Sequence, residues 1–218
     1  DDDTPYEYGY EKGDAYLQDY WKAMCKLSYQ VCKLIQEINA VKDGEPIQVK
    51  RKVYLAETTS DLKSERESIY NELNAGPYEV FPSKLLNKDD AESYINDVKE
   101  EMKNCSFSIH LIGSKYGTTP DGTEKSTVIL QEEIATEQSK TSALQRLFWI
   151  KKDENADQKI AQFISTINQD ESFHVNDDLL NGTIEEFKTE LIKKLKAADE
   201  ADKALAEPKR KQNNLPLL

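Results

Sequence analysis

Short apolar runs alternate with amphipathic segments through most of this chain. The runs Val53–Ala56, Tyr78–Phe81, Phe107–Ile112 and Leu147–Ile150 are bounded by Gly, Pro and polar residues, which predicts strands. Phe107–Ile112 carries apolar residues on both faces, as buried parallel strands do. This alternation of strand and helix predicts an α/β, flavodoxin-like fold with a doubly wound parallel sheet of four to five strands.

The segments between the runs have the spacing of helices. One helix is expected from a capping pattern at Thr58 and Asp61 to near Gly76, and the others fall after each later strand. Their predicted positions are Glu92–Lys103, a helix that Ser126 or Thr127 caps, Gln158–Asn168, and a last helix from Ile184 to Glu207 that Pro208 ends. A short edge strand is expected at Phe173–Val175, and Asp178–Thr183 is expected to lead into the last helix.

An amphipathic helix over Asp14–Ala40 is expected to precede this domain, after an irregular segment at residues 1–13. Its apolar face must pack on something, either the domain that follows or a preceding domain of which it is the last helix. The expected division is therefore an N-terminal segment at 1–45, the α/β domain at 52–196, and a helical extension with a linker at 197–218.

Composition narrows the class of protein. A net charge of −12 argues against direct binding of nucleic acid, and no apolar run approaches the roughly 20 residues of a membrane span. The acidic start lacks an initiator Met and a signal peptide, so a fragment of a longer cytoplasmic protein is expected. Cys25, Cys32 and Cys105 are interpreted as reduced core residues. The two histidines, His110 and His174, are too few and too far apart for a zinc site, and His110 is interpreted as structural.

Paired carboxylates on one helix are the candidate chemistry. Glu132 and Glu133 follow the strand Phe107–Ile112 and a polar loop, and ligands of open α/β sheets bind at the carboxyl ends of the strands. A carboxylate there suits cleavage of an N-glycosidic bond, because it can stabilise or trap an oxocarbenium-like transition state. Helical spacing does not choose between the two glutamates, and a solvated helix face is the alternative interpretation. No P-loop, dinucleotide fingerprint or GxSxG elbow is present.

The span from Val53 to about Leu195 resembles a bacterial, defence-associated Toll/interleukin-1 receptor (TIR) domain. The resemblance rests on VYLAETTSDLKSERESIYNEL, YEVFPS, INDVKEEMKNC, FSIHLIGSKYG and STVILQEEIA, in that order. It implies that Glu133, before Ile134-Ala135, is the catalytic glutamate, although Ile129 stands where many members have an aromatic residue. It further implies a role for the loop Pro82–Ala91 in substrate access and self-assembly. The nucleotide pocket would be lined by Ala56, Glu57, Thr58, Ser114 and Tyr116.

The activity that this resemblance implies is hydrolysis of NAD+ at its nicotinamide–ribose bond. NAD+ is then a substrate, no cofactor or metal is needed, and activation would come from oligomerisation in a bacterial antiphage or conflict system. The expected partners are NAD+ or a related nucleotide, other copies of the chain, and other domains of a longer parent that carries tandem TIR-like modules. Two alternatives stay open: a non-catalytic TIR-like scaffold or nucleotide-signal-binding module, and an enzyme similar to nucleoside deoxyribosyltransferases, which KVYLAE, EVFP and EEIA also resemble.

Overall fold

The fold is known from a computed structural model of the whole chain. The structure describes residues 50–153, 155–169, 177–180 and 182–212, together with eight separate positions: Tyr20, Met24, Leu27, Ser28, Val31, Leu34, Ile35 and Ile38. Within this described part, no helix has both the length and the apolar character that crossing a membrane requires.

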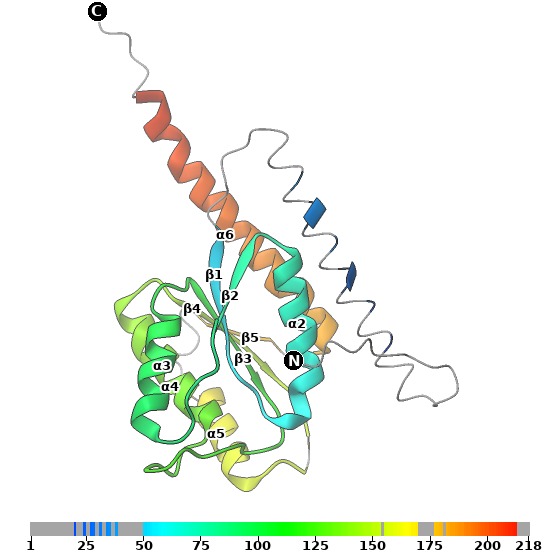
Figure 1. Cartoon of the computed structure of the whole chain (residues 1–218), viewed down its shortest axis with the longest axis vertical. Coiled ribbons are helices and arrows are strands. Elements are labelled where there is room, and N and C mark those ends of the chain that lie inside the picture. The colour runs from blue at the N-terminus through cyan, green and yellow to red at the C-terminus, as the bar shows by residue number, and fades with distance from the viewer. Residues whose placement is uncertain are drawn as a thin grey trace, which may run out of the picture.

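A five-stranded parallel sheet forms the centre of the domain (Figure 1). The strands are β1 (Arg51–Leu55), β2 (Tyr78–Phe81), β3 (Phe107–Ile112), β4 (Gln145–Ile150) and β5 (Asp177–Leu180). They lie in the order β2-β1-β3-β4-β5, and each neighbouring pair is parallel. The predicted doubly wound α/β, flavodoxin-like fold is therefore confirmed.

Helices cover both faces of the sheet. After a short 3₁₀ turn, η2 (Ser60–Leu62), the helices are α2 (Lys63–Ala75), α3 (Ala91–Met102), α4 (Thr127–Thr141), α5 (Gln158–Gln169) and α6 (Ile184–Gln212). In Figure 1, α2 and α6 lie on one side of the sheet and α3, α4 and α5 on the other. Every residue of β3 is buried because both of its faces are covered, which is the cause of its uninterrupted apolar pattern.

Three apolar clusters result, one on one side of the sheet and two on the other. On the α2 and α6 side, odd-numbered residues of β1, β3 and β4 pack with the buried faces of the two helices, for example Ile109 with Leu73 and Leu191 in one cluster. On the other side, the cores beneath α3–α4 and beneath α5 form two further clusters. The period-two alternation along each strand divides its side chains between these two faces.

The layer beneath α4 is partly polar. The Glu132 carboxylate forms an ion pair with Arg146, whose Nη1 lies 3.3 Å away, and both side chains are almost completely buried. The same carboxylate accepts a hydrogen bond from Thr136 Oγ1 at 2.5 Å. His110 is buried beside them with its ring stacked on Phe148. Burial and the positive charge of Arg146 lower the pKa of His110 to about 3, so this imidazole is neutral at pH 7.

Most element predictions agree with the structure to within a few residues, and two are wrong. Residues 177–180 form the edge strand β5 and are not a lead into the last helix; Phe148 is paired with Leu179. The predicted strand at 173–175 lies outside the described residues. The last helix does not end at Pro208, because α6 continues to Gln212. A proline inside a helix loses one hydrogen bond and crowds the preceding turn, but the residues around this one are good helix formers.

The N-terminal prediction is only partly covered by the described residues. All eight separate positions between Tyr20 and Ile38 have helical backbone, as the predicted helix over 14–40 requires. The irregular segment at 1–13 lies outside the described residues.

Candidate functional site at the carboxyl ends of the first and third strands

The strand order places a topological switch point between β1 and β3. The chain leaves β1 toward one face of the sheet and β3 toward the other, and ligands of open α/β sheets bind in the crevice outside such a point. Ala56, Glu57 and Thr58 follow β1, and Ser114 follows β3. The candidate site is therefore built from these two chain segments and from the helices beside them.

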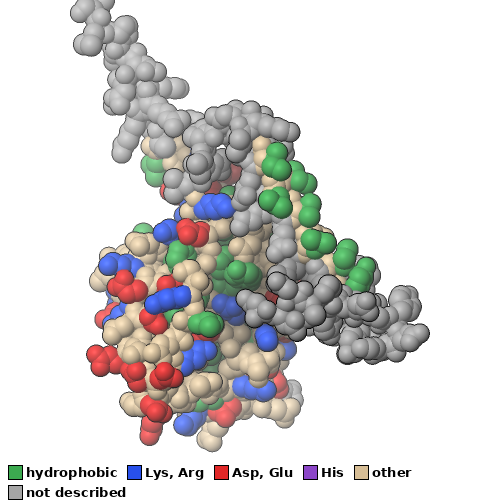
Figure 2. Space-filling model, in the orientation of Figure 1, with side chains coloured by type: hydrophobic (Ala, Val, Ile, Leu, Met, Phe, Trp, Pro, Cys, Tyr) green, Lys and Arg blue, Asp and Glu red, His purple; other side chains and the backbone are tan. Residues whose placement is uncertain are grey.

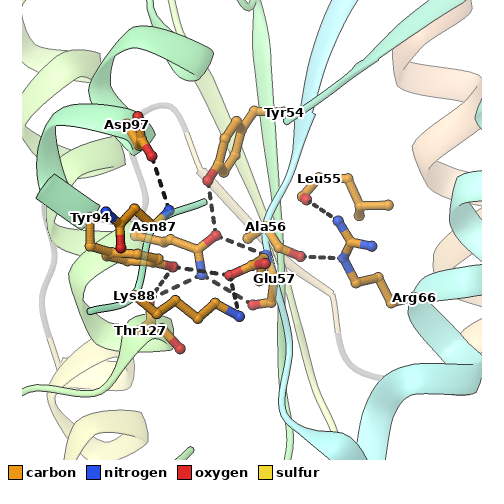
Figure 3. A network of polar contacts seen from close by, with 11 residues as sticks. Tyr54, Leu55, Ala56, Glu57, Arg66, Asn87, Lys88, Tyr94, Asp97 and Thr127 are labelled. Atoms are coloured by element: carbon orange, nitrogen blue, oxygen red, sulfur yellow. Dashed lines mark hydrogen bonds and ion pairs between the residues drawn. The ribbon is translucent and has the colours of Figure 1, made fainter. Parts of the chain in front are cut away.

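A carboxylate, a lysine and a tyrosine meet at the carboxyl end of β1 (Figure 3). Lys88 Nζ, from the loop before α3, lies 3.0 Å from Glu57 Oε2, and the Tyr94 hydroxyl donates to the same oxygen at 3.4 Å. The Glu57 side chain is 21% exposed, so water reaches one side of it. Burial is the main reason why the pKa of Tyr94 lies well above its usual value, with a further contribution from the Glu57 charge. Tyr94 thus remains a hydrogen-bond donor to Glu57.

The α4 side chain that reaches this point is the amide of Gln131. Its Oε1 accepts hydrogen bonds from the Tyr54 hydroxyl at 2.9 Å and from the Glu57 backbone N–H at 2.8 Å. Its Nε2 donates to the backbone oxygens of Glu57 and Thr127 at 3.1 and 3.0 Å. The residue is 0% exposed, so the whole amide is used inside the protein and joins α4 to the end of β1.

Arg66 holds the end of β1 from the opposite side. Its Nε and Nη2 donate to the backbone oxygens of Ala56 and Leu55 at 2.8 and 2.9 Å (Figure 3). Burial lowers the pKa of the guanidinium, and the Glu57 charge partly opposes this effect. Arg66 therefore supports the backbone after β1 and does not project toward a ligand.

Asp61 connects the loops after β1 and β3. Its Oδ2 accepts from the backbone N–H and the hydroxyl of Ser114 at 2.9 and 3.2 Å. Burial by itself would raise the pKa of Asp61, but hydrogen bonds from Thr59 and Ser114 outweigh burial and lower it. The loops approach so closely that a Cβ at Gly113 would overlap the Asp61 carboxylate.

Tyr116 points away from this cluster. Its hydroxyl donates to the Glu124 backbone oxygen at 2.8 Å, and Lys159 Nζ lies 5.0 Å from the ring centroid. The ring packs against the apolar cluster beneath α5. Among the residues proposed to line a pocket, Ala56, Glu57, Thr58 and Ser114 thus lie at the ends of β1 and β3. The Tyr116 side chain, from the same loop as Ser114, packs beneath α5 instead.

Glu133 lies on the solvent side of α4. Its carboxylate is 45% exposed and pairs with Lys125 Nζ at 2.7 Å. Gln131, two residues earlier, points toward β1, and residues two apart on a helix point to nearly opposite sides. Glu132 is held by its buried pair with Arg146. Neither glutamate is therefore brought to Glu57, and Gln131 occupies the position on α4 that faces the candidate site.

Comparison with known families covers most of this domain. Residues 52–206 match the family described as a domain of unknown function, DUF4062, and this match spans more than half of the chain. The chain belongs to the DUF4062 family. A search of curated proteins and a search of solved structures gave no match.

The DUF4062 domain contains a site residue that the sequence reasoning missed. Gln131 is the largest polar residue on the helical face that also carries Thr127, Ile134 and Ala135, all of them buried. A polar residue on the buried face of a helix is the sequence signal for such a site residue, since buried polar groups need hydrogen-bond partners. Charge alone instead favours the two glutamates that follow Gln131.

Two other features of the DUF4062 domain concern the places where an ion or ligand could bind. In the described part of the chain, no group of three or more His, Cys, Asp or Glu side chains is arranged to hold a metal ion. A groove of about 580 Å³ runs between α2 and α6, where Glu72, Lys188 and Ile192 are among the lining residues. Glu72 is near the end of α2, which runs back from the carboxyl ends of the strands, so this groove is separate from the candidate site.

Proposed function

We propose that this DUF4062 domain is a non-catalytic, TIR-like module that works by binding other protein molecules. One observation carries the proposal: the α4 side chain at the end of β1 is the neutral, fully buried amide of Gln131. Enzymes that cleave glycosidic bonds generally use a carboxylate beside the anomeric carbon. An amide with all of its hydrogen bonds satisfied inside the protein can neither stabilise a positive charge nor trap it.

The position of Glu133 supports the same conclusion. Its charge is compensated by Lys125 at the surface, and a solvent-exposed ion pair is strongly screened by water. A carboxylate in this environment lacks the water-excluded surroundings in which electrostatic stabilisation of a transition state is large.

A surface suited to protein binding lies on the loop between β2 and α3. Asp97 accepts from Lys84 Nζ at 2.6 Å and from the Asn87 backbone at 3.0 Å, and Glu101 accepts from the Ser83 backbone at 2.6 Å. Between these braces, Leu85 is 93% exposed. A braced loop loses little conformational entropy on binding, so Leu85 is preorganised as an apolar anchor. The partner proposed for this loop is another copy of the chain.

The test of the non-catalytic assignment is nicotinamide release from NAD+. The full chain is incubated with millimolar NAD+ under two conditions: at low protein concentration, and under crowded conditions that favour assembly. Nicotinamide is quantified by chromatography in both. No release above a buffer control is expected from the wild type or from Glu133→Gln. Release by the wild type that Glu133→Gln abolishes would contradict the proposal.

One observation favours a second candidate function, NAD+ glycohydrolysis through Glu57. This carboxylate lies at the switch point, is partly exposed, and is oriented by Tyr94 and Lys88. If it acts on NAD+ or a nucleoside, Glu57→Gln removes turnover and Glu133→Gln leaves it intact. That pair of results would replace the non-catalytic proposal with the enzymatic one.

Assembly through the loop has its own test. Leu85→Ser is compared with Tyr70→Ser, which removes an exposed apolar residue from α2. The Leu85 variant is expected to weaken concentration-dependent assembly beyond a dimer in sedimentation velocity, and the Tyr70 variant to leave it unchanged. Equal behaviour of both variants would exclude the loop as a contact surface.

A further inference from the structure

Seven large apolar side chains between residues 20 and 38 are exposed on helical backbone. Their exposed fractions run from 37% to 57%, and the domain does not bury them: Tyr20, Met24, Leu27, Val31, Leu34, Ile35 and Ile38. Figure 2 shows hydrophobic side chains in a row at the edge of the molecule. An apolar row of this length is far more than the scattered hydrophobic residues of an ordinary surface.

The spacing of these residues is that of a coiled coil. Six of them, from Tyr20 to Ile38, alternate in steps of four and three residues, and Leu17 and Val41 extend the same series in the sequence. Steps of three and four give an average period of about 3.5 residues, which keeps one seam facing a partner helix. The series covers more than three heptads, enough to indicate a coiled coil.

The residue types at the two seam positions select the partner. In this register, position a holds Leu17, Met24, Val31 and Ile38, and position d holds Tyr20, Leu27, Leu34 and Val41. The two β-branched residues at a, Val31 and Ile38, combined with Leu27 and Leu34 at d, favour a parallel, two-stranded coiled coil. We propose that the segment from Leu17 to Val41 pairs in parallel with the same segment of a second copy of this chain. This inference goes beyond the proposed function and does not depend on it.

The charge of the segment permits such self-pairing. The whole chain has a net charge of −12, so two copies repel one another over most of their surface. Between Asp14 and Lys42, however, four lysines stand against three acidic residues. The e and g positions beside the seam hold mainly uncharged residues such as Ser28 and Ile35. Pairing along this segment therefore avoids the repulsion that other surfaces would produce.

A parallel pair places the two DUF4062 domains on the same end of the coiled coil. Linking two domains in this way raises the local concentration of each for the other to about the millimolar range. Weak contacts between domains, such as those proposed for Leu85, then form at protein concentrations at which separate domains would remain apart. The helix is thus a constitutive dimerisation element beside a weaker assembly surface.

Sedimentation equilibrium of the full chain tests the proposal. The wild type is expected to be a dimer, and Leu27→Asp combined with Leu34→Asp to weaken dimerisation by at least 100-fold. Gln36→Asp, at an outward heptad position, is the control and should remain dimeric, as should Leu85→Ser. Thermal unfolding of the domain verifies that the double variant remains folded. A monomeric wild type, or a double variant that dimerises as well as the control, would overturn the inference.

Oxidative cross-linking tests the orientation. With the native cysteines replaced by serine, Met24→Cys alone is expected to form a disulfide-linked dimer, because position a meets itself in a parallel pair. Failure of Met24→Cys to cross-link in a dimeric sample would overturn the parallel arrangement. A dimer lost in Leu85→Ser but retained in the double aspartate variant would refute the coiled coil while supporting the loop contact, so the two ideas fail separately.

Discussion

Replacing Gln131 with leucine tests whether this amide joins α4 to the end of β1. Leucine has a similar volume, so the main effect is the loss of hydrogen bonds and not a cavity. The Tyr54 hydroxyl and the Glu57 backbone N–H both lose their acceptor, and Tyr54 is fully buried. A buried donor left without a partner costs about 1–3 kcal/mol, so two such groups cost about 2–6 kcal/mol.

That loss is large against the total stability of a domain, which is about 5–15 kcal/mol. Urea unfolding measures this loss. It is followed by the fluorescence of Trp149, which is buried in β4, in a Trp21→Phe background that removes the other tryptophan of the chain. Gln138→Leu is the matched control, because Gln138 lies on the same helix and makes one exposed hydrogen bond, to Lys99. The control is expected to change the free energy of unfolding by less than about 0.5 kcal/mol.

A double-mutant cycle with Tyr54→Phe then measures the interaction energy between Tyr54 and Gln131. Tyr54→Phe should cost less in the Gln131→Leu background than alone, because the hydroxyl has already lost its acceptor there. Additive effects of the two substitutions, or a Gln131→Leu cost within about 1 kcal/mol of the Gln138→Leu cost, would refute the structural role assigned to Gln131.

Three further predictions concern buried groups. Glu132→Gln should destabilise the domain by about 3–5 kcal/mol, because Arg146 loses the buried carboxylate that it contacts. Glu137→Gln at the surface should have little effect in the same urea assay. Similar losses of stability in the two variants would contradict the buried pair. The pKa of His110 is lowered to about 3, so its contribution to stability is complete above about pH 6.5 and is lost as the pH falls toward 3. The free energy of unfolding should therefore fall by about 2 kcal/mol more in the wild type than in His110→Phe between pH 7 and 5, and parallel pH profiles would contradict this prediction. Burial raises the pKa of Cys105 to about 12. In a variant with the other two cysteines replaced by serine, this thiol should therefore react with Ellman's reagent only when the protein unfolds. Rapid labelling of the native protein would show that the thiol is accessible.

The first four strands could be predicted because each is a short apolar run between turn residues. The predicted bounds of Phe107–Ile112 and Tyr78–Phe81 match β3 and β2 to the residue, and of these two only β3 is buried along its whole length. β5 was not, because Asp177-Asp178 begins an edge strand whose pairing with β4 is decided by tertiary contacts and not by a local pattern. The extension of α6 past Pro208 was missed because a proline weighs heavily in a local prediction.

The candidate site was predictable in its location but not in its contents. Parallel strands bring Glu57 and Ser114 to the same edge of the sheet, and topology alone predicts that. Which residue of α4 faces that edge depends on the rotation of the helix, and three adjacent polar residues, Gln131, Glu132 and Glu133, differ by about 100° each. Their different environments follow from packing against β1 and β4, which sequence spacing did not resolve.

The most direct test of this account is hydrogen exchange at the Gln131 side-chain amide, observed by ¹H–¹⁵N NMR of the native protein. The Gln131→Leu variant identifies the signals, and exposed glutamine side chains in the same spectra serve as the reference. Because both ends of this amide are hydrogen-bonded in a fully buried position, its two protons should exchange at least 100-fold more slowly than the reference. Exchange at the reference rate would mean that the contact between Gln131 and the end of β1 opens to water, and the account of Gln131 as a structural, non-catalytic residue would be wrong.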